Sequence, residues 1–477
     1  MVNNSNSAPI SHLMRRAGFG ATPNETVQLV KQGYEETVEK LLNYDNHDEI
    51  DERLLYRYLP MTEMMYAPEQ LIVECGNLAK LNWLYRMVNT ERPLEEKMTL
   101  FWHHVFATGL SKVQYGYEMN EQILLFREYA LGNYRDLLIR LAANPAMIFW
   151  LDNQENHKRA PNENWGRELL ELFSMGVGNY TENDVKEASR AFTGWTFSGK
   201  VSGIQLGPIP WRFEYHPEDH DWKEKEFLGQ FGQFNGEDIV EIIVQQPACA
   251  KFLARHLYNF FVADEPPVTT WPIAPPPNPA AIDLIAHSII ESKYEMRPVL
   301  RTLFNADFFK EATFKKVKNP VEIFASTLRL TGNMNQPDPD WISLSTEPDQ
   351  MGQEILNPPS VEGWHTGKEW INSGAFINRV NFVADRMRDT GLPGIQDIIN
   401  RIAYSNGETM APETLVDKCL DVLGQVHISE ETRAELVEEA SSEGPLAWTN
   451  NEDSMASSRR VGDVLASIVG TREYQFG

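Results

Sequence analysis

Two adjacent histidines in an apolar segment are the first residues of this chain that could do chemistry. His103 and His104 lie between Trp102 and Val105. On a helix, Glu96 and His103 share one face, whereas His104 lies about 100° further round. Imidazole is a common metal ligand and titrates near neutral pH, so both histidines are candidate metal ligands and His103 is also a candidate catalytic residue. The alternative is a buried histidine whose nitrogens bond to backbone or carboxylate groups in the core.

The second candidate is a pair of glutamates three residues apart. Glu168 and Glu171 fall on one side of the helix that the pattern predicts over residues 162–174, and Arg167 lies on a neighbouring line. Two carboxylates at this spacing can hold a cation together or share a proton. All three residues are therefore candidate catalytic residues, and both glutamates are candidate metal ligands. The alternative is an ion-pair network around Arg167.

The third candidate is the polar turn from His216 to Asp221, which follows a short stretch of alternating hydrophobicity. It presents Asp219 and His220 as candidate ligands for zinc, manganese or iron, or as acid–base groups. Such residues are also common in exposed turns without any role, and a solvated turn is the alternative for this segment.

Composition and charge narrow the class of protein. The chain has 477 residues, and 68 Asp and Glu against 43 Lys and Arg give a formal net charge of −25. This charge disfavours binding to nucleic acid and to anionic membranes. The polar N-terminal start and the lack of an apolar run of about 18 residues predict a cytoplasmic protein without membrane spans. The sequence contains no Cys-x-x-Cys pair, phosphate-binding loop, nucleophile elbow or His-Glu-x-x-His zinc helix.

Helical periodicity dominates the elements that must position the candidate residues. Amphipathic helices are predicted over residues 68–89, 93–107, 117–131, 134–143, 162–174 and 181–193. Thr22 and Glu25 form a capping-box pattern in front of a further helix. One stretch differs, because the hydrophobicity of residues 211–215 alternates with a period of two. Together with residues 225–229, this stretch predicts one small hairpin. The expected fold class is mainly α, a large multi-helical single domain with a small β-hairpin insertion near residues 210–230.

Five short motifs follow one another along the chain. They are HLMRRAGFG at residues 12–20, FWH at 101–103, NENWGRELLEL at 162–172, AFTGW at 191–195 and PPSVEGW at 358–364. In this order they resemble the motifs of the bacterial family called domain of unknown function 1800. The resemblance implies one extended, mainly helical domain, with a core over residues 1–395. An acidic helical C-terminal portion, residues 396–477, is expected to pack on the same domain.

The resemblance also bears on the site and on partners. Where many family members have Trp-His-Asn-His-Phe, this chain has His103, His104 and Val105, so a metal site that needs two histidines would have to use His104. Members of the family are often exported, whereas the polar N-terminus here favours the cytoplasm. They are also often encoded beside proteins of the family of unknown function 1501, which resembles alkaline-phosphatase-type hydrolases.

Two classes of function follow from these features. In the first, the chain is a metal-dependent enzyme, hydrolytic or oxidative, and its candidate ligands converge on a divalent ion such as zinc, manganese, iron or calcium. These ligands are His103, His104, Glu168, Glu171, Asp219 and His220. In the second, the chain is a non-catalytic helical scaffold that binds a phosphatase-like protein of the 1501 family. The enzyme is favoured, because histidine and glutamate in apolar helices carry a burial cost that function explains.

Overall fold

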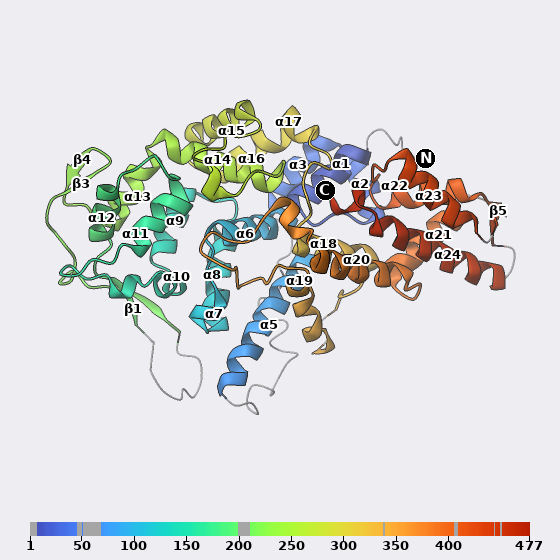
Figure 1. Cartoon of the computed structure of the whole chain (residues 1–477), viewed down its shortest axis with the longest axis horizontal. Coiled ribbons are helices and arrows are strands. Elements are labelled where there is room, and N and C mark those ends of the chain that lie inside the picture. The colour runs from blue at the N-terminus through green and yellow to red at the C-terminus, as the bar shows by residue number, and fades with distance from the viewer. Residues whose placement is uncertain are drawn as a thin grey trace.

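Helices form most of the part of the chain that the computed structural model describes (Figure 1). The described residues are 7–44, 50, 68–198, 210–336, 339–404, 409–442, 444–448 and 451–477. The predicted mainly α fold class is confirmed. Within the described ranges, every helix falls short of the length and hydropathy that crossing a bilayer requires.

Before the first strand, the helices predicted over residues 68–89, 93–107, 117–131, 134–143, 162–174 and 181–193 are present, together with shorter ones that were not predicted. They are α1 (Ser7–Ala17), α2 (Pro23–Gln32), α3 (Tyr34–Leu42), α5 (Pro68–Asn89), α6 (Pro93–Val105), α7 (Leu110–Val113), α8 (Gly116–Glu128), α9 (Tyr134–Ala142), α10 (Pro145–Trp150), η4 (Asn153–Glu155), α11 (Asn164–Glu168), η5 (Leu169–Ser174) and α12 (Glu182–Ala191).

The helices that follow the first four strands fill the rest of the chain. They are α13 (Gly236–Val244), α14 (Pro247–Phe261), η6 (Val268–Thr270), α15 (Pro279–Glu291), α16 (Met296–Asn305), α17 (Asp307–Lys310), α18 (Pro320–Thr331), η7 (Pro339–Thr346), α19 (Glu347–Gln350), η8 (Gly367–Trp370), α20 (Ser373–Arg388), α21 (Pro393–Tyr404), α22 (Pro412–Val422), α23 (Glu430–Ser441), α24 (Asn451–Gly470) and η9 (Glu473–Gln475).

Side-chain caps determine where several helices begin. At the start of α2, the Thr22 hydroxyl accepts from the Glu25 N–H, and the Glu25 carboxylate accepts from the Thr22 N–H. This is the capping box that the sequence predicts. Thr181 and Asp184 form the same arrangement at the start of α12. Each pair satisfies backbone N–H groups that have no partner inside the helix.

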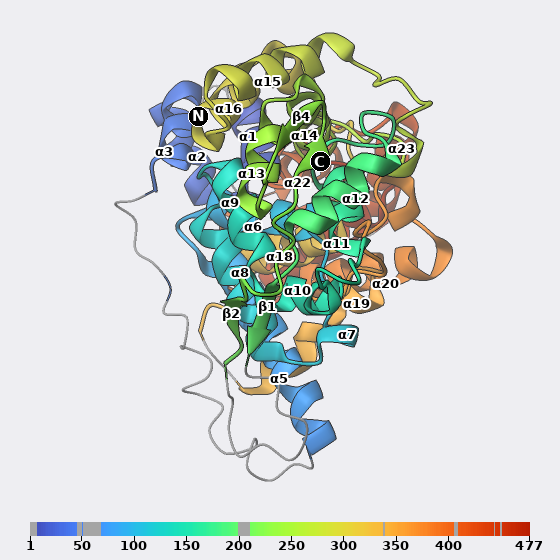
Figure 2. The same ribbon diagram turned by 90° about the vertical axis from the view of Figure 1, so that its left-hand side faces the viewer.

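Helix α6 runs through the interior and is buried on nearly all sides, beside α8 in both views (Figure 1 and Figure 2). It packs against α1, α3, α5 and α8. A helix that is buried all round must pair the charges it carries. Glu96 accordingly bonds to Arg86 and Arg127, and Lys97 bonds to Glu322. This helix carries His103 and His104 into the core.

The strands form small antiparallel pairs within the described part of the chain. The pairs are β1 (Trp195–Ser198) with β2 (Arg212–Tyr215), β3 (Lys225–Phe227) with β4 (Gln230–Gly232), and β5 (Thr409–Met410) with β6 (Leu446–Ala447). The small β insertion is confirmed, but the predicted pairing of residues 211–215 with 225–229 is wrong. Leu228 and Gly229, both at positive φ, instead make a tight turn between β3 and β4. An alternating pattern marks a strand but does not select its partner.

The C-terminal helices lie at one end of the long axis of the molecule (Figure 1). Helix α24 packs along α20, and α22 and α23 pack on each other and on α24. Helix α1 reaches the same group. The Gln425 side-chain amide donates to Ser7 Oγ at 2.7 Å, and Arg15 donates to the Gly424 carbonyl at 2.9 Å.

Candidate functional site

The two predicted glutamates lie where α11 changes into a π-helix, η5. The wider turn is closed by a hydrogen bond from the Met175 N–H to the Leu170 carbonyl at 2.9 Å and by the Ser174 hydroxyl, which donates to the Leu169 carbonyl. π-helical turns are rare and are found frequently at functional sites. The spacing of Glu168 and Glu171 is visible in the sequence, but the change of helix type is not.

Glu168 has the titration behaviour of an acid–base group. Burial and the neighbouring negative charge of Glu171 raise the pKa of Glu168 to about 7, with Glu362 adding to the effect. The positive charge of Arg167 opposes this rise without cancelling it. At neutral pH this carboxyl group is therefore divided between its protonated and ionised forms, which suits proton transfer.

Glu171 lines a cavity of about 410 Å³. Its carboxylate accepts a hydrogen bond from the Tyr180 hydroxyl at 3.2 Å. Trp271 and Phe252 form aromatic parts of the cavity wall. Arg255 also lines the cavity, with its guanidinium 4.6 Å from the centre of the Trp271 ring. A carboxylate pair thus has direct access, through Glu171, to a space large enough for a small molecule.

Arg167 does not pair with Glu171. Its guanidinium bonds to Glu163 at 3.2 Å and to Glu182, on α12, at 2.7 Å. Gly166 allows the same two helices to approach closely, since a Cβ there would lie 2.4 Å from Ser189 Oγ. Arg167 and Gly166 therefore hold α11 against α12 and so position the two glutamates.

His103 is fully buried and is held by the backbone. Its Nε2 accepts a hydrogen bond from the Leu356 N–H at 3.2 Å, and its ring lies edge-on to Trp83 and Trp364. Burial, followed by the charge of His104, lowers the pKa of His103 to about 3. His103 is thus a neutral imidazole that joins α6 to the segment after α19.

The ring of His104 packs between Trp364 and Phe260. Its ring stacks on Trp364, with 6.2 Å between ring centres and 6° between planes. Burial, followed by the charge of Lys316, lowers the pKa of His104 to about 4. His104 in turn contributes to lowering the pKa of His256 to about 3, after burial, so the two imidazoles are neighbours.

His256 is a residue that the sequence motifs do not mark. The centre of its ring lies 4.7 Å from those of both Phe252 and Trp271, directly behind the cavity wall. Within the described part of the chain, its Nε2 has no hydrogen-bond partner. Tyr180 and Glu362 were also not predicted as site residues, although Glu362 belongs to the PPSVEGW motif. Tyr180 is close to Glu171 in the sequence, whereas Glu362 comes near Glu168 from a distant segment and His256 packs on the cavity wall.

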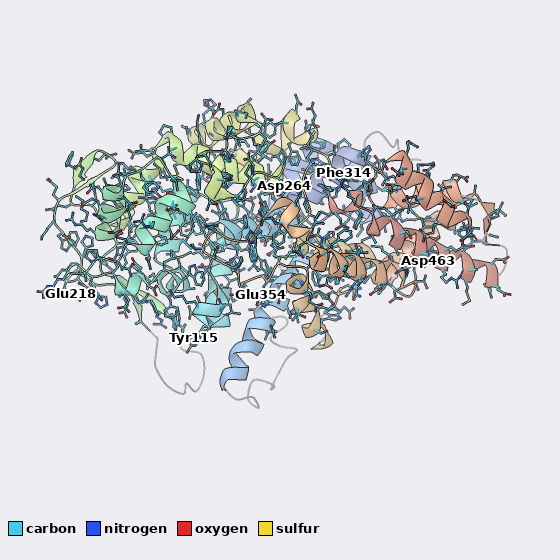
Figure 3. All side chains as sticks on the ribbon, in the orientation of Figure 1. Tyr115, Glu218, Asp264, Phe314, Glu354 and Asp463 are labelled. Atoms are coloured by element: carbon cyan, nitrogen blue, oxygen red, sulfur yellow. The ribbon has the colours of Figure 1, made fainter. Side chains whose placement is uncertain are left out.

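Asp219 and His220 contact other partners. Asp219 bonds to His157 at 2.5 Å, and the Nδ1 of His220 contacts the Thr193 carbonyl at 2.9 Å. Figure 3 places Glu218, the neighbour of Asp219, at the opposite end of the molecule from Asp463, whereas Glu354 lies near the centre. The polar turn is therefore built into the β1–β2 region.

The structure brings together only part of the predicted ligand set. Glu168 lies with Glu171, and His103 lies next to His104, whereas Asp219 and His220 bond to the residues named above. In the described ranges, no three His, Cys, Asp or Glu side chains are grouped so that they could hold a metal ion. The binding of a divalent metal stays a prediction.

The fold and the site define a large, mainly helical protein with a carboxylate pair at a junction between an α-helix and a π-helix. The chain belongs to the family described as protein of unknown function (DUF1800), whose model matches residues 12–476. The resemblance that the motifs indicate is thereby confirmed over nearly the whole chain. No curated protein and no solved structure matches the chain.

Proposed function

We propose that this protein is a hydrolytic enzyme in which Glu168 and Glu171 transfer protons to and from a small molecule bound in the adjoining cavity. The observation that carries the proposal is the position of the two carboxylates, which sit together at the π-helical turn with Glu171 on the cavity wall. The pKa of Glu168, raised to about 7, fits the role of a general acid at neutral pH.

The residues divide the chemistry in the following way. Glu168 does not line the cavity, so its protonated form gives the proton through a bridging water molecule to the leaving oxygen of the substrate as the scissile bond breaks. Glu171, oriented by the Tyr180 hydroxyl, accepts a proton from the water molecule whose oxygen forms the new bond. The proton on Glu171 and the one missing from Glu168 are then exchanged with solvent, which restores both groups.

The cavity indicates the class of substrate. Two of its cations are already paired, Arg255 with Glu265 at 2.7 Å and Lys251 with Asp283 at 3.0 Å. The rest of the wall is mostly apolar and includes aliphatic side chains as well as the aromatic Phe252 and Trp271. We therefore propose a neutral substrate with a ring, such as a glycoside or an aryl ester, which can stack on Trp271.

A panel of nitrophenyl glycosides and nitrophenyl esters tests the proposal, with and without added zinc, manganese, iron or calcium. Glu168→Gln and Glu171→Gln are expected to lower kcat by about a hundredfold or more. Glu163→Gln is the matched control, because Glu163 precedes the same helix, its carboxylate bonds to Arg167, and it does not line the cavity. Unchanged turnover in both variants, or no turnover of the panel by the wild type under any condition, would contradict the proposal.

The metal-dependent form of the proposal is tested separately. If a divalent ion takes part, Glu168 and Glu171 are the first ligands to expect, with Glu362 next to them. Elemental analysis of the purified protein and calorimetric titration with each ion would then show binding that Glu168→Gln weakens. Turnover that is insensitive to chelators would exclude the metal-dependent form and support proton transfer by the carboxylates without a metal.

A further inference from the structure

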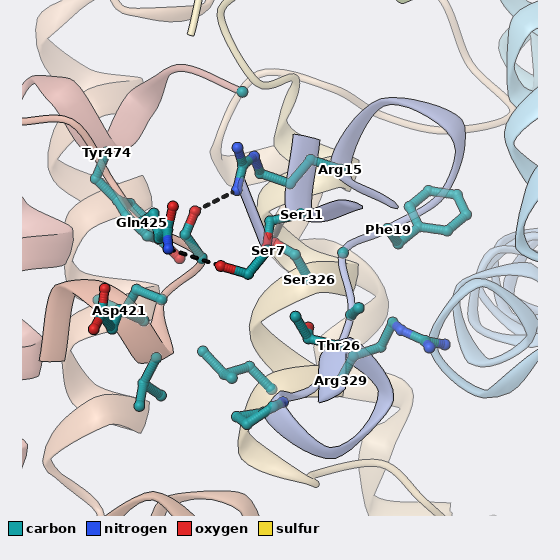
Figure 4. A pocket seen from close by; sticks show the side chains of 18 of the residues that line it. Ser7, Ser11, Arg15, Phe19, Thr26, Ser326, Arg329, Asp421, Gln425 and Tyr474 are labelled. Carbon is teal, nitrogen blue, oxygen red and sulfur yellow. Dashed lines mark hydrogen bonds between the residues drawn. The ribbon is translucent and has the colours of Figure 1, made fainter. Parts of the chain in front are cut away.

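A second cavity, of about 290 Å³, lies where α1, α2 and α18 meet the turn after α22 (Figure 4). It shares no lining residue with the cavity beside Glu171. Its lining combines five cations, Arg15, Arg16, Lys318, Arg329 and Arg401, with apolar side chains that include Phe19. The HLMRRAGFG motif at residues 12–20 thus contributes a large part of this wall.

Arg15 reaches this cavity without an ion-pair partner among the described residues. One Nη of its guanidinium donates to the Gly424 carbonyl at 2.9 Å, as Figure 4 shows, and its Cζ lies 4.8 Å from the centre of the Phe314 ring. Its Nε is buried and has no hydrogen-bond partner among the residues that the structure describes. Burial, followed by the charge of Arg16, lowers the pKa of Arg15 to about 10. An anion next to this guanidinium would offset the cost of burying it.

Lys318 is a second buried cation at this cavity. It is 8 % exposed, its Nζ donates to the Tyr474 carbonyl at 2.7 Å, and it lies 3.8 Å from the centre of the Tyr474 ring. No carboxylate of the described residues forms an ion pair with it. Burial, followed by the charges of Arg15 and Arg379, lowers the pKa of Lys318 well below its ordinary value.

The buried carboxylate at this cavity is already engaged. Glu322 bonds to Lys97 and lies 3.4 Å from Arg16, and its second oxygen accepts from the Asn319 N–H at 2.8 Å. Glu322 therefore forms ion pairs with Arg16 and Lys97, and its charge acts on Lys318 only from a greater distance. This local excess of positive charge contrasts with the net charge of −25 of the whole chain.

We propose that this cavity binds a small anion that carries a short apolar chain, such as an alkyl carboxylate or an alkyl phosphate. The anionic group lies beside Arg15 and Lys318, because guanidinium and ammonium groups bind carboxylate and phosphate oxygens through charge-assisted hydrogen bonds. The apolar chain contacts Phe19 and the aliphatic residues Val27 and Val422. The volume is at the lower limit of small-molecule sites, roughly 300 Å³, so the chain must be short.

Isothermal titration calorimetry with hexanoate, hexyl phosphate, inorganic phosphate and hexanol tests this site. At least one of the two alkyl anions is expected to bind about tenfold more tightly than hexanol, a ratio that corresponds to about 1.4 kcal/mol. The stronger of the two identifies the head group as carboxylate or phosphate. Inorganic phosphate that binds as tightly as hexyl phosphate would overturn the apolar part of the proposal.

Variants locate the binding. Arg15→Gln and Lys318→Met are expected to weaken binding of the alkyl anion about tenfold or more, and Arg15→Lys to restore part of it. Arg433→Gln is the matched control, since Arg433 is paired with Asp417 at 2.8 Å and does not line the cavity. Thermal denaturation of each variant shows that it is folded. Binding that is unchanged in both Arg15→Gln and Lys318→Met would overturn the proposal.

The position of Gly477 calls for one further control experiment. Gly477 lines the cavity, and its N–H donates to the Lys316 carbonyl at 2.8 Å. A carboxyl group on Gly477 would lie near the same cations, so the titrations are repeated on a chain extended by a Gly-Ser-Gly tail. Binding by either form supports the proposal, and failure of both alkyl anions to bind either form would overturn it.

Discussion

Glu96 has no exposed surface, yet it carries a negative charge that three donors hold. It accepts from Trp83 Nε1 at 2.9 Å, from Arg86 Nε at 3.0 Å and from Arg127 Nε at 2.8 Å. Burial alone would raise the pKa of Glu96, but the charges of Arg127 and Arg86 outweigh it and lower the pKa. We expect Glu96→Gln to decrease the free energy of unfolding by about 3 kcal/mol, because two buried guanidiniums lose their counter-ion. Urea denaturation at pH 7 measures this change.

Glu182→Gln is the control for this prediction, because Glu182 bonds to Arg167 on the surface. Its urea midpoint is expected to stay close to that of the wild type. The stabilisation from Glu96 is present above the pKa of a glutamate in the unfolded chain and is lost as the pH falls through the lower pKa of the folded state. The difference between wild type and Glu96→Gln should therefore shrink in acid. An equal effect of both substitutions would contradict the argument.

Glu168 is expected to show the opposite dependence on pH. Its pKa is raised to about 7 in the folded state, so between the ordinary pKa of glutamate and pH 7 the folded chain binds the proton more tightly than the unfolded chain. The free energy of unfolding therefore falls as the pH rises through this window. Glu168→Gln should be more stable than the wild type at pH 8 and nearly equal to it at pH 4. Denaturation curves of the two proteins at both pH values test this, and an equal difference at both would refute it.

At the scale of elements, the segment that carries Glu362 and Trp364 is held against α6 through a glycine. Gly363 has a φ of +89°, and a Cβ there would lie 2.5 Å from the His104 carbonyl oxygen. Gly363→Ala is expected to decrease the free energy of unfolding by about 2–3 kcal/mol, since strain at positive φ adds to a clash with backbone. The same substitution should lower the pKa of Glu168, because it moves Glu362 away. Denaturation and carbon-13 NMR of labelled glutamate measure the two effects.

Gly178→Ala separates these two contributions. Gly178 has a φ of +94°, but no atom lies within 4 Å of a Cβ placed there. This variant is expected to lose only the conformational part, about 1 kcal/mol, and to leave the titration of Glu168 unchanged. If both glycine variants decrease the free energy of unfolding by the same amount, the close contact with His104 does not contribute to stability.

The elements and the site differ in how far the sequence predicts them. The capping box of Thr22 and Glu25 is a local interaction, so its pattern predicts the start of α2 correctly. The partner of residues 212–215 is not local, and the sequence selects the wrong segment. The site follows the same rule. The spacing of Glu168 and Glu171 is local, whereas Glu362 comes near Glu168 only through packing. The π-helical turn depends on tertiary contacts, and its residues look α-helical.

At the scale of the whole molecule, the two signs of charge are distributed unequally. Buried cations such as Lys97, Lys318 and Arg379 gather around Glu322, while the net charge of the chain is −25. The acidic excess therefore lies mainly towards the surface, as on α23, where it can attract a basic partner over a distance. The scaffold hypothesis, with a phosphatase-like partner of the 1501 family, rests on this surface and stays a prediction. Co-purification of the two proteins at low and high salt would test it.

The contacts of α20, Lys318 and Arg379 with the C-terminal residues predict how the molecule unfolds. Helix α24 packs along α20, Lys318 bonds to the Tyr474 carbonyl at 2.7 Å, and Arg379 bonds to the Gln475 side chain at 3.1 Å. Arg379 also donates to the Lys318 carbonyl at 2.7 Å, so a buried network joins residues before and after the expected boundary at residue 395. We therefore expect the amides of α24 and α6 to exchange with deuterium through one common unfolding transition. Arg379→Met should increase the exchange rates of both helices by the same factor. Earlier exchange of α21–α24 alone, at lower denaturant, would show that the C-terminal portion is an independent unit.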